Sequence, residues 1–408
     1  MNKKRRRIVV TGLGVCVANG ATVPEFLANL RGGVAGIGPV SDFDTSCYRS
    51  QQAGVVRSLR VEPGHPDSAL DRAAQMALRS AYEAVRESKL TIAGELAYRT
   101  SVCVGTSLGG MHGHIRRLRG EYERDPTTDF EGACGDLLNV PPCQIANLLS
   151  HRFGARAGNA TVVTACAAGS NSIAVGIDWI REDRADVVIA SATDPLCELS
   201  FSGFNILMAL SRTRCRPFDR DRDGLVIGEG AGTLVLEEEE HARRRGATIH
   251  AELAGYGLSN DAYHPTQPDP DAGGACRAIR RALSDARVVP AQIDYINAHG
   301  TATRYNDDTE LKAVASIYGK RMADIPISSI KSMVGHTLGA AGTIEAVATV
   351  LAVKHGFLPP TVNTKIGVNG YEYDFVPEAR DAPRLRYACS HSFGFGGNAA
   401  CLVIGRAQ

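Results

Sequence analysis

Short apolar runs alternate with segments of helical periodicity along the first half of the chain. Apolar strands are predicted at residues 8–10, 101–104, 186–190 and 232–236. Leu70 to Ser88 carries apolar side chains at helical spacing, which predicts an amphipathic helix. Strands of this kind, separated by helices, are typical of a mainly parallel sheet with helices on both faces.

The same order of elements begins again near residue 250. The predicted elements of this second series are a strand over 249–257, a helix over 274–286, a strand over 294–297, a glycine-rich helix start at 335–342 and a last strand at 400–404. The segment between the two series, 237–245, reads as a charged helix face. We therefore predict an α/β chain of two similar halves, residues 1–248 and 249–408.

The chain length agrees with two halves, and the composition argues against nucleic-acid-binding, membrane and secreted proteins. The chain has 408 residues, more than one ordinary core uses, and 44% of them are hydrophobic. Its formal net charge of +1 gives no reason to expect nucleic acid as a partner. The basic run at residues 2–7 is interpreted as a solvent-exposed segment that leads into the first strand. No apolar run reaches the ~18 residues of a membrane span, and no signal peptide precedes the first strand. The 11 cysteines include no CxxC pair, which favours reduced thiols and a cytoplasmic location.

Two short motifs that could bind a ligand are discounted. Gly12 and Gly14 begin a dinucleotide fingerprint, but its third glycine position holds Val17. The segment His112-Gly113-His114 is too sparse for a metal site and is interpreted as a surface turn. Neither motif predicts a cofactor.

Cys166 follows a predicted strand at 161–164 and precedes a helix that begins with small residues. A helix N-terminus favours a thiolate through its free N–H groups and its dipole. The dipole contributes about 0.3–1 kcal/mol, less than the roughly 1.4 kcal/mol of one pKa unit, so it leaves such a thiol mostly protonated at pH 7. Cys166 is therefore either a packed core residue or a nucleophile that other groups assist.

Three later stretches favour a nucleophile. His299 follows a predicted strand, and Lys331 and His336 lie five residues apart at a helix start. Residues 392–398 form a glycine-rich turn with two aromatic side chains before the last strand. One histidine is usually a packed core residue, but two at strand and helix ends, with a cysteine similarly placed in the other half, are less easily explained by packing alone.

The segments TACAAGS, NAHGTAT, KSMVGHTLGAAG and SFGFGGN occur in this order in the sequence. Together they resemble the β-ketoacyl-acyl carrier protein synthase family, specifically the elongating synthase I/II branch of the thiolase-like condensing enzymes. The resemblance covers essentially the whole chain. It implies the thiolase-like fold, in which two pseudo-symmetric α/β halves form five layers (α-β-α-β-α), and it implies a homodimer.

The resemblance also implies an activity and its residues. Acyl transfer to a cysteine would precede decarboxylative condensation with a malonyl group, both substrates being carried on the phosphopantetheine of acyl carrier protein. The implied roles are Cys166 as nucleophile, His299 and His336 as donors to the enolate, Lys331 as the charge that orients them, the backbone N–H groups of Cys166 and Phe395 as oxyanion hole with Phe395 as gate, Asp307 and Glu310 as supporting acids, Thr301 and Thr303 as pantetheine-binding hydroxyls, and Leu108 and Phe204 as acyl-pocket walls. No metal and no free cofactor is expected, because loss of CO₂ drives the carbon–carbon bond formation.

Two stretches depart from the housekeeping pattern of the family. Asn398-Ala399 stands where Thr-Asn is usual, and the lead-in at 65–69 has almost none of the positive charge that helps an acidic carrier to dock. Arg116, Arg117 and Arg119, or an associated subunit, are the alternatives for carrier docking. These departures lead to the hypothesis of a specialised fatty-acyl or polyketide pathway.

Rival classes differ at identifiable positions. A degradative thiolase has a late Cys-x-Gly motif where this chain has residues 393–397, and an initiating synthase has a His/Asn pair rather than His299 and His336. A non-catalytic chain-length subunit loses the nucleophile, whereas Cys166 is present. The catalytic ketosynthase subunit of a type II polyketide synthase, paired with a chain-length factor, stays open as the alternative function.

Overall fold

The structure is a computed structural model that describes residues 5–62, 64–115, 120, 140–365 and 373–407. The first half contains β1 (Ile8–Val17), α1 (Val23–Gly32), β2 (Ile37–Pro39), β3 (Gln52–Gly54), α2 (Arg72–Ser88), β4 (Thr100–Gly105), α4 (Cys143–Phe153), β5 (Gly158–Val162), α5 (Ala168–Arg181), β6 (Val187–Asp194), α6 (Glu198–Ile206), β7 (Gly230–Glu238) and α7 (Glu239–Arg244). Two short 3-10 helices, η1 (Pro66–Ala69) and η2 (Gly94–Arg99), lie on either side of α2.

The second half begins at β8. Its elements are β8 (Ala251–Asn260), α8 (Gly273–Ala286), β9 (Tyr295–Asn297), α9 (Arg304–Tyr318), β10 (Ile327–Ser328), α10 (Lys331–Val334), α11 (Ala341–His355), β11 (Phe357–Leu358), β12 (Arg380–Asp381), β13 (Tyr387–Gly394) and β14 (Asn398–Arg406). Short 3-10 helices occur at η4 (Pro290–Gln292), η5 (Gly319–Asp324), η6 (Leu338–Ala340) and η8 (Phe395–Gly397). Most predicted strands and helices are therefore confirmed within a few residues.

The strand order repeats between the two halves. From the centre of the ten-stranded sheet outwards, the first half runs β1-β7-β6-β4-β5 and the second runs β8-β14-β13-β9-β10. In each half the two inner pairings are antiparallel and the two outer pairings are parallel. The halves meet where residues 8–10 pair with residues 251–253. The division at residues 248 and 249 itself stays a prediction.

The prediction of a mainly parallel sheet is wrong. Among the described strands of the large sheet, five of the nine pairings are antiparallel. The physical reason is burial. Every residue of β7 and most residues of β14 are buried, so these two antiparallel strands have continuous apolar runs, as buried parallel strands do. Strand direction could not be deduced from such runs.

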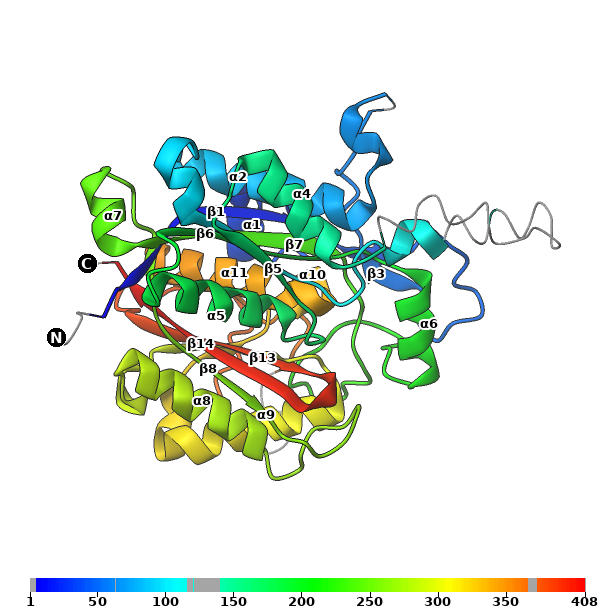
Figure 1. The fold of residues 1–408 in the computed structure, drawn as a ribbon. Coiled ribbons are helices and arrows are strands. Elements are labelled where there is room, and N and C mark those ends of the chain that lie inside the picture. Colours follow the sequence, from blue (N-terminus) through cyan, green and yellow to red (C-terminus); the bar gives the residue numbers. More distant parts are fainter. Residues whose placement is uncertain (1–4, 63, 116–119, 121–139, 366–372, 408) are drawn as a thin grey trace.

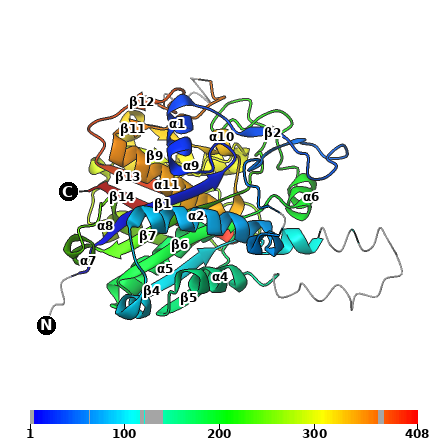
Figure 2. The same ribbon diagram turned by 90° about the horizontal axis from the view of Figure 1, so that it is seen from above.

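Five layers are visible in Figure 1, as the family resemblance implied. Helices α2 and α4 cover one face of the first half-sheet, α5 and α11 lie between the half-sheets, and α8 and α9 cover the outer face of the second. Figure 2 gives the view from above, onto α2 and the strands beneath it. Thirteen residues of α11, from Ala341 to Val353, are buried, as expected of a helix enclosed between two sheets.

Glycines let helices approach backbones closely at two places. A side chain on Gly14 would collide with the carbonyl oxygen of Ser80 in α2, so the glycines of β1 serve helix packing and not a dinucleotide. Where α5 crosses α11, a Cβ on Gly169 would lie 2.7 Å from the backbone nitrogen of Thr343. This crossing brings the N-terminus of α5 and that of α11 together, and with them Cys166 and His336.

Three local predictions are corrected by the structure. The charged segment 237–245 is helical only from Glu239, because Glu237 and Glu238 end β7. Arg5 to Arg7 are not a solvated lead-in, because they pair with carboxylates, such as Asp186 and Glu252, of both halves. His112 does not lie in a surface turn: it is helical and buried, with Nδ1 2.8 Å from the Leu196 carbonyl oxygen. In the described part of the chain, we find no helix with both the length and the apolar character of a membrane span.

Candidate active site

A cavity of about 410 Å³ lies between the two halves. Its wall includes Cys166 from the first half and His299 and His336 from the second. The structure therefore brings Cys166 together with two histidines that lie more than 130 residues further along the sequence. Phe204, Phe395, Thr301 and Thr303 also line this cavity.

Cys166 is held at the N-terminus of α5 by a tight connection. β5 ends at Val162, Ala165 has a positive φ of 50°, and the helix begins at Ala168. The Cys166 Sγ lies 3.1 Å from His336 Nε2. Burial raises the pKa of the thiol to about 12, and the nearby Lys331 ammonium opposes this shift. The free thiol is thus neutral at pH 7, with an imidazole in place to take its proton.

Lys331 determines the tautomer of His299. Its Nζ lies 3.2 Å from His299 Nδ1, and it forms a buried ion pair with Glu345 of α11. An ammonium can only donate, so Nδ1 must be the accepting nitrogen and Nε2 must carry the ring proton. Because His299 lines the cavity, this arrangement makes its Nε2–H available as a hydrogen-bond donor there.

Both histidines are neutral at physiological pH. Burial lowers the pKa of His299 and of His336 well below the usual range, and the charge on Lys331 lowers both further. Their rings meet edge to face with centroids 5.3 Å apart. Two neutral imidazoles beside one thiol can accept and donate protons without adding fixed charge to the cavity.

The two predicted acids occupy different positions. Glu310 accepts hydrogen bonds from the backbone N–H groups of His299 (2.9 Å) and Gly300 (2.8 Å), so it fixes the segment that carries the histidine. Asp307 instead accepts hydrogen bonds from the backbone N–H groups of Phe218 and Ala302. Burial raises the pKa of Asp307 to about 6.

The glycine-rich turn at residues 392–398 closes one side of the cavity. A side chain on Gly394 would lie 3.0 Å from the backbone nitrogen of Cys166, so the turn touches the strand–helix connection. The Phe395 ring is 5.6 Å from that of Phe204, and its carbonyl oxygen accepts a hydrogen bond from Asn398 Nδ2 (2.9 Å). Asn398, where the sequence departs from the family pattern, thus holds the turn itself.

Of the remaining predicted residues, two reach the cavity and one does not. Thr301 and Thr303 line it side by side, with their hydroxyl oxygens 2.8 Å apart. Leu108 is not among the residues that line it; its backbone N–H donates to the buried Asp194 carboxylate. Arg116, Arg117 and Arg119 lie outside the described residues.

Sequence reasoning missed three buried groups beside the cavity. Glu345 pairs with Lys331, His391 contacts Glu310, and Asp194 accepts hydrogen bonds from the loop at 106–108 and from Gly339. Glu345 was detectable, because it is the one charged residue in the apolar run from 341 to 353. Asp194 and His391 follow ordinary strand sequences, and their neighbours come from distant parts of the chain.

Comparisons with known proteins agree with this geometry. Residues 5–242 match the beta-ketoacyl synthase N-terminal domain and residues 250–365 match the C-terminal domain. The 3-oxoacyl-[acyl-carrier-protein] synthase 2 of Synechocystis sp. is 38% identical over 421 residues, which cover 100% of each chain. The synthase 2 of Staphylococcus aureus strain N315 is 36% identical, over 98% of each chain.

A solved structure shares the fold over nearly the whole chain. The ishigamide ketosynthase/chain length factor matches with a TM-score of 0.92 and 38% identity, covering 99% of this chain and 100% of that one. The two family matches and the full-length identity lead to one assignment. The chain belongs to the β-ketoacyl synthase family, the acyl-transferring condensing enzymes of thiolase-like fold that its motifs predicted.

Proposed function

We propose that the chain is a β-ketoacyl-[acyl-carrier-protein] synthase that loads an acyl group on Cys166 and extends it with malonyl carrier protein. The observation that carries this proposal is the Cys166–His336 contact of 3.1 Å, next to a second neutral imidazole in one cavity. The names of the full-length relatives support the same substrate class. Homodimerisation and a cytoplasmic location are part of the proposal.

In the first step, the Cys166 thiol attacks the thioester carbonyl of the acyl carrier. His336 Nε2 takes the thiol proton as the new S–C bond forms, and the old C–S bond breaks. The released pantetheine thiolate then receives that proton. The backbone N–H groups of Cys166 and Phe395 would stabilise the oxyanion, and the Phe395 turn would admit the acyl chain.

In the second step, malonyl carrier protein loses CO₂ and leaves an enolate. The Nε2–H group of His299 would donate to the enolate oxygen while the enolate carbon attacks the acyl-Cys166 carbonyl, and His336 would add a second donor once its ring proton has moved to Nε2. A new C–C bond forms, the thioester to Cys166 breaks, and the released thiolate takes a proton from solvent. Lys331 keeps the His299 proton on the cavity side, and Thr301 and Thr303 would bind the pantetheine arm.

We expect a His299→Ala variant to separate the two steps. It lacks one enolate donor, so decarboxylation should slow by roughly 10²–10³-fold, as when an oxyanion-hole donor is removed. Acyl loading should stay within a few-fold of wild type, because His336 still contacts Cys166. Release of labelled CO₂ from malonyl carrier and the mass of the acyl-enzyme measure the two steps. Equal loss of both steps would contradict the assigned role.

A second candidate is the catalytic subunit of a type II polyketide synthase paired with a chain-length factor. One solved neighbour, at a TM-score of 0.90 and 32% identity over 99% of this chain and 100% of that one, is a type II PKS acyl-carrier protein in complex with its ketosynthase bound to the hexaketide. A ketosynthase/chain length factor assembly is also similar. β5 forms the outer edge of the first half-sheet and offers a pairing surface to either partner.

We expect the chain expressed alone to form a homodimer of twice 43.4 kDa, measured by light scattering. An edge strand with an exposed neighbour such as Val163, 55% accessible, is stabilised by pairing. A chain that stays monomeric, and dimerises only with a co-expressed chain-length factor, would contradict the homodimer and favour the second candidate.

A further inference from the structure

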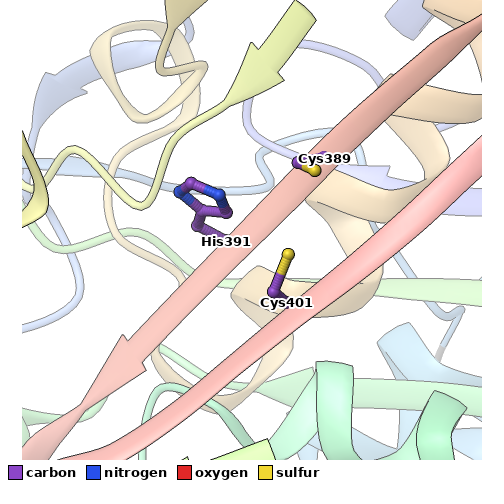
Figure 3. Close-up of side chains that lie close together, drawn as sticks. All are labelled: Cys389, His391 and Cys401. Carbon is purple, nitrogen blue, oxygen red and sulfur yellow. The ribbon is translucent and has the colours of Figure 1, made fainter. Parts of the chain in front are cut away.

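A second cluster of reactive side chains lies behind the cavity, between β13 and β14. Cys389 and His391 are two positions apart on β13, and Cys401 stands opposite His391 on β14. The antiparallel register therefore places all three side chains on one face of the sheet. All three residues are fully buried, and Figure 3 shows them facing a common space.

The spacing of these groups fits a metal ion. The two sulfurs and one ring nitrogen of His391 all lie within 4.8 Å of one another. Three atoms at such separations lie within about 2.8 Å of a common point, and Zn–S and Zn–N bonds are about 2.3 and 2.0–2.1 Å, so small side-chain movements suffice. Two thiolates and an imidazole are also ligands that zinc prefers.

The surroundings of His391 single out one nitrogen as a ligand. Nδ1 lies 3.1 Å from Glu310 Oε1, whereas Nε2, though buried, has no hydrogen-bond partner among the described residues. In metal sites the ligating histidine commonly donates its other N–H to a carboxylate, which fixes the ring. Tyr318 adds a second outer contact, with its hydroxyl 3.4 Å from Cys389 Sγ. His391 Nε2 is thus free to bind a metal ion, and the contact of Nδ1 with Glu310 is the one expected of a ligating histidine.

We propose that Cys389, His391 and Cys401 bind a structural zinc ion between β13 and β14. The ion would displace the thiol protons and bond both sulfurs and His391 Nε2. Zinc in proteins is normally four-coordinate, so a water molecule or the Tyr318 oxygen would complete the site. The site is separate from the reacting atoms, and no step of the proposed condensation uses it.

The zinc would also stabilise the position of His299 indirectly. A zinc ion that holds His391 would also hold Glu310 in place through their contact. Glu310 in turn accepts hydrogen bonds from the backbone N–H groups of His299 and Gly300. Because all three ligands are fully buried, the ion must enter during folding, and the finished chain should neither take it up nor lose it quickly.

The test is the metal content of the full chain expressed in medium with added zinc. Mass spectrometry of the purified protein should find about one zinc per chain in wild type. Cys401→Ala and Cys389→Ala should retain at least about tenfold less. Cys103→Ala is the matched control, a fully buried cysteine in β4, and should keep the wild-type content.

A spectroscopic readout makes the test independent of whether the variants fold. Wild-type chain expressed with cobalt in place of zinc should show the thiolate-to-cobalt charge-transfer absorption of a two-sulfur site. Wild type without stoichiometric metal and without this absorption would overturn the proposal. Metal retained equally by Cys401→Ala and wild type would overturn it too, since the ion would then bind elsewhere.

Discussion

Replacement of Cys166 by alanine is expected to abolish acyl loading and to lower the condensation rate by on the order of 10⁶-fold, as removal of a nucleophile does in other covalent enzymes. The thiol is the only atom of this side chain that can bond the acyl carbon. Alanine is smaller and fits the strand–helix connection, so the fold should remain. The intact mass after incubation with acyl carrier protein measures the loading.

The control for this experiment is Cys103→Ala, which removes a buried thiol that is not in the cavity wall and should load normally. Persistent labelling of the Cys166→Ala chain would mean that another thiol is the nucleophile. Ten cysteines are described as free thiols, so the comparison of variants is needed to identify the reacting one.

Replacement of Lys331 by methionine is expected to lower the free energy of unfolding by about 3–5 kcal/mol, the cost of leaving one member of a buried ion pair without its partner. Lys331 and Glu345 have side chains only 1% and 2% exposed. Burial already raises the pKa of Glu345 to about 7 in spite of the lysine. Denaturant unfolding at several pH values measures the loss.

The pH dependence follows from the direction of that shift. The folded Lys331→Met chain would hold the Glu345 proton more tightly than the unfolded chain, whose glutamate has a pKa near 4.3. Protons therefore favour the folded state, and the free energy of unfolding of the variant should fall as pH rises from about 5 to 8. Its loss relative to wild type should be constant below about pH 7 and grow above it, where Glu345 of wild type ionises beside Lys331. A loss that does not grow between pH 7 and 8 would contradict an unpaired carboxylate as its cause.

The double variant Lys331→Met/Glu345→Gln separates stability from activity. It removes both charges, so much of the lost stability should return. Condensation should stay slow, because nothing then holds the His299 proton on the cavity side. Recovered condensation in the double variant would show that Lys331 acts through folding alone.

The strands and helices of the two halves were predictable because elements that are buried in the core have apolar runs of characteristic length in the sequence. The predicted strand at 232–236 and helix at 274–286 correspond to β7 and α8. Strand direction was not predictable, since β7 is buried on both faces and has the sequence of a parallel strand. The repeated strand order becomes evident only when the pairings are known.

The candidate site was predictable where chemistry-bearing residues sit at strand and helix ends. Cys166, His299 and His336 share these positions, and the structure brings them into one cavity. Buried partners from other elements were not predictable: Glu345 contacts Lys331 across the core, and Cys401 meets His391 through strand register. Leu108 was predicted to line the acyl pocket, but it is not among the residues of the cavity wall, and its backbone N–H donates to Asp194.

The central claim is that one sulfur and two neutral imidazoles, contributed by opposite halves, carry out acyl transfer and condensation in a single cavity. The most direct measurement is the intact mass of the wild-type chain, first with an acyl carrier protein and then after malonyl carrier protein is added. We predict that the chain gains the acyl mass and then loses it, while the malonyl carrier becomes a β-ketoacyl carrier two carbons longer than the donor. An acyl group that loads but is never discharged by malonyl carrier, or a chain that no acyl carrier loads, would contradict the account.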